Sequence, residues 1–186
     1  MCCEVIYLDF KKAFDTVDHS ILLSKLGTLE IPPFLLHWLS SYLHNRRFRV
    51  CVRGSVSCWS SSPSGVPQGS VLGPTLFNIF INDLPSQLRY AFCLLFADDL
   101  KIYRTIKSDT DCELLQHDLL TIAKWAQDNR MSFNVSKSVV LHIGSNNPHA
   151  QYYLNDLQIL PKDTVKDHGV LVDNKLKFHQ QSAALV

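Results

Sequence analysis

Three aspartates stand where an apolar core should exclude them. Asp9 ends the apolar, β-rich run of residues 4–10, and Asp98-Asp99 separates the apolar runs 90–96 and 100–103. A carboxylate is costly to desolvate, and two adjacent like charges cost more unless a cation lies near. Mg²⁺ is commonly held by one or two carboxylates together with substrate phosphates. The pattern indicates a divalent-metal site, with an exposed Asx turn as the open alternative for Asp98-Asp99.

A loop rich in glycine and proline is the second feature with chemical potential. Residues 65–74 read GVPQGSVLGP, so glycines and prolines surround one amide side chain, Gln68, before a helix begins. Glycine lets the backbone approach a flat or phosphorylated ligand closely. The loop could equally be a structural elbow, and its residues alone do not decide between the two.

Basic residues cluster in a third segment. Residues 47–53 alternate between apolar and basic side chains, which predicts a strand with one face of each kind, turned by Gly54-Ser55 into a hairpin. A solvated strand face and a phosphate-binding face are both open for its arginines, together with the preceding one: Arg46, Arg47, Arg49 and Arg53.

The elements that must position these residues alternate between strands, helices and hairpins. We expect strands over 4–10, 90–96, 100–103, 139–143, 152–159 with a turn at Asn155-Asp156, and 170–172. Helices are expected after Asp18, from Pro33, from Gly73 to Leu84, and from Ser108. The spacing of Leu35, Trp38, Leu39, Tyr42 and Leu43 predicts one packed face on the second helix. This order predicts a sheet covered by helices on one face.

Composition limits the remaining function classes. The 186 residues are 46% hydrophobic with a net charge of +1, so we expect one sizeable core and only local basic surface. The longest apolar run, 90–97, is far shorter than a membrane span, and the first residues form no signal peptide. We therefore expect a soluble, intracellular protein with free thiols, in which Cys93 lies in the core; a structural zinc site is the alternative.

Five ordered segments carry a family resemblance that covers residues 5–178. The chain resembles the reverse transcriptases, and most closely those of non-LTR, LINE-type retrotransposons. The resemblance rests on segments that read YLDFKKAFD (7–15), SGVPQGSVLGP (64–74), FADD (96–99), NRMSFNVSK (129–137) and GVLVD (169–173).

The resemblance implies an α+β fold, the polymerase palm, in which a ferredoxin-like antiparallel sheet is backed by helices. It implies that Asp9, Asp98 and Asp99 converge on the open face and hold two Mg²⁺ ions, with Mn²⁺ as a substitute. By the same resemblance the carboxylates serve nucleotidyl transfer from a deoxynucleoside triphosphate to a primer 3′-hydroxyl. Lys137 corresponds to a lysine that protonates or neutralises pyrophosphate, with an ordinary surface lysine as the alternative.

Further residues acquire substrate roles only through the resemblance. Phe14 corresponds to the aromatic residue beneath the sugar, where a ring would clash with a 2′-hydroxyl; a core position is the alternative. Contacts with the incoming nucleotide and template are implied for Phe10, Phe14, Pro67, Gln68 and Gly69. An RNA template, a DNA primer and deoxynucleotides are the implied partners, and a membrane is not.

The likeness also has limits. We expect residues 1–178 to be the palm, with the fingers largely missing, the thumb absent and 179–186 a divergent tail. His168 stands where the family usually has leucine. The expected role is therefore that of a retrotransposon-derived RNA-directed DNA polymerase palm, incomplete and with little activity alone, whose fingers, thumb and endonuclease regions belong to a parent polyprotein in the cytoplasm or nucleus.

Two other function classes remain open at this point. One is a non-catalytic nucleic-acid-binding remnant that uses the four arginines, and retained Mg²⁺-dependent nucleotide binding would argue against it. The other is a palm-like cyclase or nucleotidyl transferase without a template, which the proline-glutamine-glycine segment at 67–69 disfavours.

Overall fold

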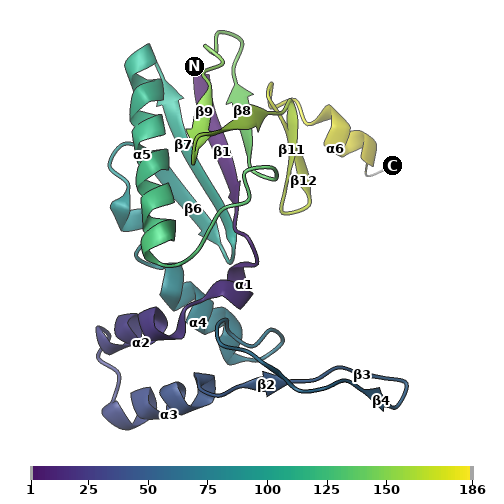
Figure 1. Ribbon diagram of the computed structural model, residues 1–186. Coiled ribbons are helices and arrows are strands. Elements are labelled where there is room, and N and C mark those ends of the chain that lie inside the picture. Colours follow the sequence, from purple (N-terminus) through teal and green to yellow (C-terminus); the bar gives the residue numbers. More distant parts are fainter. Residues whose placement is uncertain (1, 185–186) are drawn as a thin grey trace. The chain divides into compact units, whose positions relative to one another are not determined.

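The structure is a computed structural model that describes residues 2–184 (Figure 1). Its internal contacts divide the chain into two compact units. The first unit contains residues 2–11, 84–128 and 132–184, and the second contains residues 12–83 and 129–131. Sheet and helices occur together with mainly antiparallel pairing, so the expected α+β class is confirmed.

A six-stranded sheet forms the centre of the first unit, in the order β6-β7-β1-β8-β10-β9. All neighbours are antiparallel except β8 and β10. The strands are β1 (Cys2–Asp9), β6 (Phe92–Phe96), β7 (Asp99–Ile106), β8 (Val139–Ile143), β9 (Tyr152–Leu154) and β10 (Leu157–Pro161). As the buried character of β1 predicts, this strand lies between two neighbours, β7 and β8.

Helix α5 (Asp109–Asp128) covers one face of this sheet (Figure 1). Side chains of β1 alternate between the two faces, so Ile6 and Leu8 lie on the covered face, where they are 0% and 3% exposed. The helix contributes Leu115, Leu119 and Ile122, each 0% exposed. Burying each such side chain contributes roughly 1.5–3 kcal/mol to the stability of the fold. Asp9, one residue after Leu8, lies on the opposite face of the sheet.

A small hairpin completes the described part of the first unit. It pairs β11 (Thr164–Asp167) with β12 (Val170–Asp173), and it is followed by α6 (His179–Ala184). Strand β11 was not predicted, because its short and largely polar sequence gives little apolar alternation. The turn is made by His168 and Gly169, whose φ angles of 46° and 89° are both left-handed.

The second unit is mainly helical. It contains α1 (Ala13–Thr16), α2 (His19–Gly27), α3 (Pro33–Leu43) and α4 (Leu72–Ile81). The predicted start of α2 is confirmed, because the Asp18 carboxylate accepts a hydrogen bond of 3.0 Å from the Ile21 amide. Pro33 opens α3 as expected for a residue whose amide nitrogen carries no hydrogen.

Two sequence predictions in this unit were wrong in part. On α3 only Leu39 and Leu43 of the predicted packed face are buried, whereas Trp38 is 49% exposed. The predicted strand over 47–53 is interrupted, and the hairpin consists of four two-residue strands: β2 (Arg47–Phe48), β3 (Cys51–Val52), β4 (Ser55–Val56) and β5 (Ser60–Ser61). Spacing identifies one face of an element but does not say whether another element covers it.

The predictions about the cysteines and about membrane-spanning segments can also be compared with the structure. All six cysteines are free thiols, as expected. Cys93 is only partly buried, because it lies on β6, the edge strand of the sheet, and this partial burial raises the pKa of its thiol to about 11. Within residues 2–184, no helix is long and apolar enough to cross a membrane.

The buried carboxylate of Asp118 is expected to be a major stability determinant of the first unit. Asp118, on α5, is 0% exposed and accepts hydrogen bonds from the amides of Arg89, Tyr90 and Ala91 at 3.2, 2.7 and 2.7 Å. Asp118→Ala leaves these donors without that acceptor, so the free energy of unfolding in urea should fall by about 3 kcal/mol.

The matched control is Asp128→Ala, which removes an exposed carboxylate of the same helix that pairs with Lys124 at the surface. This variant should remain within about 0.5 kcal/mol of the original chain. Equal losses in the two variants would show that burial of the Asp118 carboxylate is not what matters.

Candidate active site

Asp9 and Asp99 face each other across neighbouring strands of the first unit. Asp9 is the last residue of β1, Asp99 is the first residue of β7, and the two are direct partners in the antiparallel register. Direct partners project on the same face of a sheet with their Cβ atoms about 4.5–5.5 Å apart. Like charges in this position destabilise a sheet, so a cation between the two carboxylates would be stabilising.

Asp98 reaches the same place through a tight turn. Phe96 pairs with Asp99, which leaves only Ala97 and Asp98 to connect β6 to β7. Ala97 adopts φ 51°, a left-handed conformation that costs a residue with a Cβ roughly 1 kcal/mol or more. The two-residue turn therefore holds the adjacent carboxylates of Asp98 and Asp99 at the end of the sheet where β1 also ends.

A second turn, residues 134–138, is tied to the backbone of Asp9. The Asn134 amide donates to the Asp9 carbonyl at 2.7 Å, and the Asp9 amide donates to the Ser138 hydroxyl at 3.3 Å. This turn brings the ammonium Nζ of Lys137 to 3.9 Å from the Asp9 carboxylate. Asp9, Asp98, Asp99 and Lys137, together called the acidic site, are thus brought together within the first unit.

The pKa of the Asp9 carboxyl is shifted by its surroundings. Its pKa lies above the ordinary value, first because burial penalises the charged form and further because Asp98 and Asp99 are negative, while Lys137 acts in the opposite direction. The neighbouring ammonium does not neutralise the site. Negative charge is therefore concentrated at this end of the sheet.

The donor set suits a hard divalent cation, since carboxylate oxygens are the ligands that Mg²⁺ prefers. Over residues 2–184, no group of three or more His, Cys, Asp or Glu side chains is placed so that it could hold a metal ion. Asp98 and Asp99 are exposed, so changes of side-chain rotamer are open to both. The opposed charges and the raised pKa of Asp9 fit a site that gains stability when a cation enters.

The second unit holds the glycine- and proline-rich loop, tied down against α1. The amides of Gly65 and Val66 donate to the carbonyls of Val17 and Phe14, both at 2.8 Å. Gly65 has φ 88°, and a Cβ there would lie 2.8 Å from the backbone of Asp15, so only glycine fits. The Gln68 amide donates to the Asp15 carboxylate at 2.9 Å.

The predicted substrate residues have different surroundings. Phe14 is partly exposed and stacks on buried Phe77 with ring centroids 4.4 Å apart, while Pro67, Gln68 and Gly69 lie at the surface of the loop. Phe10, in the first unit, is 4% exposed and stacks on Phe133. The expectation that the Phe10 side chain touches substrate does not agree with this buried position, which follows from its place directly after the core strand β1.

The four candidate arginines lie together at the hairpin of the second unit. Arg46 stacks over the ring of Tyr42 at 5.0 Å, and Arg49 over Trp59 at 4.7 Å. Arg47 belongs to β2, and Arg53 occupies the turn between β3 and β4 with φ 48°. The structure thus groups all four on one hairpin and at its base.

Two residues that were not predicted as site residues lie beside the acidic site. Ser138 is 2% exposed and anchors the Asp9 backbone, and a buried serine gives no recognisable sequence signal. His168, at the tip of the β11–β12 hairpin, lies with Nδ1 3.8 Å from Asp99, and its ring contacts Phe96 edge-on. In the sequence, His168 stands out only as a departure from the leucine usual in the family.

Comparison with known proteins decides the family. Residues 1–179 match the family described as reverse transcriptase (RNA-dependent DNA polymerase). The chain belongs to the reverse transcriptase family. A probable RNA-directed DNA polymerase from transposon X-element of Drosophila melanogaster is 33% identical over 184 residues, covering 95% of this chain and 20% of that protein.

Another relative of this chain is the RNA-directed DNA polymerase from mobile element jockey of Drosophila melanogaster, 32% identical over 92% of this chain and 20% of the relative. The resemblance to non-LTR retrotransposon enzymes is therefore confirmed. Among solved structures, telomerase from Candida tropicalis in complex with a telomeric RNA fragment superposes with a TM-score of 0.63 at 12% identity, over 96% of this chain and 30% of the telomerase chain. This likeness confirms the polymerase fold.

Proposed function

We propose that this chain is the palm of a retrotransposon RNA-directed DNA polymerase, which transfers a deoxynucleotide to a primer 3′-hydroxyl on an RNA template inside the cell. The observation that carries the proposal is the direct opposition of Asp9 and Asp99, with Asp98 beside them, at one end of the sheet. The chain spans about a fifth of the length of the curated relatives it matches, so the activity of a whole polymerase is part of the proposal.

The acidic site would supply the ligands for catalysis. Asp9, Asp98 and Asp99 would hold two Mg²⁺ ions, with Mn²⁺ as a substitute, and these ions would activate the primer hydroxyl and stabilise the triphosphate charge. Lys137, beside Asp9, would donate a proton to the departing pyrophosphate or neutralise it. Ser138 and the turn 134–138 would keep Lys137 and the Asp9 backbone in place.

The second unit would supply nucleotide contacts. Gln68 and Gly69 are the exposed residues of the anchored loop and follow half-buried Pro67. The backbone and amide groups of these three residues would contact a nucleotide or template base. Phe14 would lie beneath the sugar, and Phe10 would support the site only through its backbone and its packing. The four arginines would contact the nucleic acid.

Phe14→Val should reduce discrimination against ribonucleotides. The ring is partly exposed and is supported from behind by Phe77, so shortening it opens space where a 2′-hydroxyl would otherwise clash. In a complete relative carrying this segment, relative use of ribonucleotides over deoxynucleotides should rise by about tenfold in kcat/KM. Phe92→Val, at an exposed ring on β6, is the control; unchanged discrimination in Phe14→Val would assign the ring to packing.

The boundaries proposed for this function are residues 1–178 for the palm and 179–186 for a divergent tail. Fingers, thumb and endonuclease regions would come from the remainder of a parent polyprotein. Alone, the 186 residues should have little activity. The second candidate, a non-catalytic nucleic-acid-binding remnant, is favoured by the grouped arginines. It does not explain why the two aspartates oppose each other.

Metal-dependent thermal stability tests the proposal. A raised pKa means that the folded chain binds the Asp9 proton more tightly than the unfolded chain does, so charged Asp9 costs stability above this pKa and the cost disappears as the pH falls through it. Asp9→Asn should therefore melt at a higher temperature than the original chain at pH 7 without metal.

With Mn²⁺ at about 100 times its Kd, the original chain should gain roughly 2.7 kcal/mol, and Asp9→Asn should gain far less. Asp156→Asn, which removes an exposed carboxylate at the β9–β10 turn, should respond like the original chain. Equal metal stabilisation of all three proteins would refute the proposed metal-binding role of Asp9.

A further inference from the structure

The charge of this chain is strongly uneven along the sequence. The 52 residues from 31 to 82 contain four arginines, no lysine and no aspartate or glutamate, although the whole chain has a net charge of only +1. All four arginines fall within residues 46–53. Residues 46–62, called the arm here, therefore carry positive charge with no acidic side chain of their own to neutralise it.

The arm is a hairpin with an irregularity at Arg49. Phe48 pairs with Ser60, and the Ser57 amide donates to the Val50 carbonyl at 2.9 Å. Between these pairs one residue, Arg49, opposes two, Cys58 and Trp59, which is the arrangement of a β-bulge. The Trp59 ring lies 4.7 Å from the Arg49 guanidinium, so the bulge sets an aromatic ring among the arginines.

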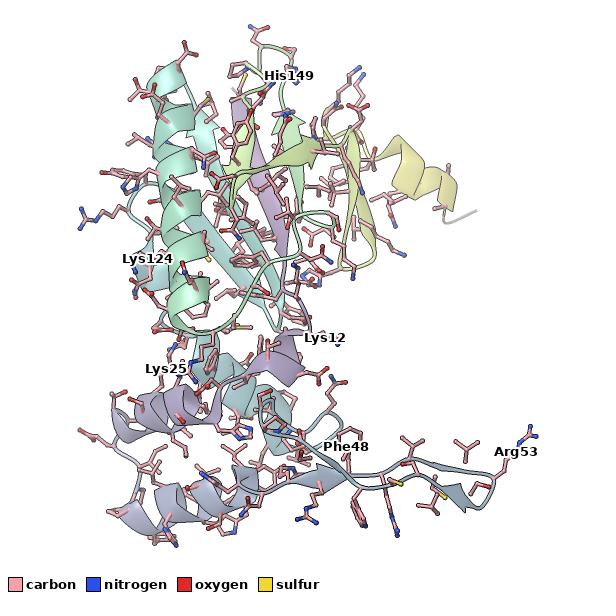
Figure 2. All side chains as sticks on the ribbon, viewed as in Figure 1. Lys12, Lys25, Phe48, Arg53, Lys124 and His149 are labelled. Carbon is pink, nitrogen blue, oxygen red and sulfur yellow. The ribbon has the colours of Figure 1, made fainter. Side chains whose placement is uncertain are left out.

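The arm exposes large apolar side chains as well as charge. Trp59 is 58% exposed and Phe48 54% exposed, and Val50, Val52 and Val56 are each 48–60% exposed. Figure 2 shows the Phe48 and Arg53 side chains projecting outward from the arm, with Arg53 at its tip. A hairpin of 17 residues with these side chains in water is poorly explained by folding alone, because its apolar groups stay hydrated.

We propose that the arm binds single-stranded RNA, with Trp59 stacking on a base and Arg47, Arg49 and Arg53 contacting phosphates. An aromatic ring beside a guanidinium offers a flat, cationic platform, and stacking on it needs a base whose face is free, as in a single strand. In a duplex the base faces are covered by their neighbours. The inference deepens the proposed function, because it locates where this chain would hold an unpaired template.

Fluorescence anisotropy with the full chain and a fluorescein-labelled, unstructured RNA tests the proposal. The RNA has about 12 nucleotides, a length that fits single-strand sites. Trp59→Ala should weaken binding by about tenfold, and Trp59→Phe should recover most of the loss because it restores a ring. Arg49→Ala should weaken binding. It should also make the fall of log K with log salt less steep, reducing the magnitude of the negative slope by about 0.7. Phe34→Ala removes a ring that is 75% exposed on α3 and should bind as the original chain does.

The matching RNA duplex should bind more weakly than the single strand and should be insensitive to Trp59→Ala. The proposal is overturned if no binding is seen at about 20 mM salt, where phosphate contacts are strong, or if Trp59→Ala and Phe34→Ala behave alike. It is also overturned if Trp59→Ala changes the sedimentation of the chain instead, which would make the arm a protein-binding surface.

Asp98→Asn separates this inference from the proposed function. It should leave RNA binding unchanged, because Asp98 is not a residue of the arm and asparagine keeps the size of its side chain. If arm variants bind RNA normally while Mn²⁺ still stabilises the chain through Asp9, only the role of the arm is wrong. If the arm variants lose RNA binding and Mn²⁺ has no effect, the proposed polymerase function is wrong and the arm proposal stands as RNA binding alone.

Discussion

Asp98→Asn, introduced into a complete reverse transcriptase that carries this segment in place of its own, is expected to lower the rate of DNA synthesis by about 10²–10³-fold. Asp98 lies in the strained two-residue turn beside Asp99, which in turn opposes Asp9. Asparagine keeps the size and the turn but removes one negative charge from the group that would hold metal. The metal-dependent transfer of the nucleotide should therefore slow, while the protein stays folded.

Single-turnover primer extension on an RNA template measures this effect. Primer–template affinity should change by less than about twofold, since Asp98 is proposed to act on metal and not on the duplex. Asp156→Asn is the matched control at another exposed hairpin turn of the same sheet and should retain full activity. Normal synthesis by Asp98→Asn would contradict the catalytic role.

The isolated chain is expected to extend no primer. Phosphoryl transfer depends on positioning, and a displacement of about 1 Å can cost on the order of 100-fold in rate. The 186 residues amount to about a fifth of the relatives' length. We expect further segments of a whole polymerase to be needed to fix a primer and a triphosphate in place. A net charge of +1 also gives little counterion release on binding a duplex.

Purified chain, a labelled primer annealed to an RNA template, deoxynucleotides and Mn²⁺ provide the measurement. The expected result is weak, salt-sensitive binding with no extension, while the complete enzyme carrying the same segment extends the primer. Extension by the isolated chain that disappears in Asp98→Asn would show that the palm alone organises the reaction.

Elements with strong local signals could be predicted from the sequence. The Asp18 cap specifies the start of α2, and left-handed Asn155 and Asp156 make the expected turn between β9 and β10. The ordered segments around Asp9, Asp98 and Lys137 predict that these residues share one site, and the structure brings them together. Local backbone preferences and ordered motifs carry this information.

Features that depend on distant neighbours could not be predicted. Nothing near Ser138 in the sequence indicates that its hydroxyl accepts from the Asp9 amide, 129 residues away. The bulge that places Trp59 beside Arg49 depends on the register of two strands and not on either strand alone. Trp38 shows the converse, since its helical spacing fits a packed face that no described element covers.

Mn²⁺-induced broadening of aspartate side-chain signals tests the central claim most directly. In the chain labelled with ¹³C at aspartate carboxyls, substoichiometric Mn²⁺ should broaden the signals of Asp9, Asp98 and Asp99 together, because paramagnetic relaxation falls steeply with distance from the ion. The exposed Asp128 and Asp156 should keep sharp signals at the same Mn²⁺ concentration. Broadening of Asp98 and Asp99 without Asp9, or uniform broadening of all exposed aspartates, would contradict a shared metal site.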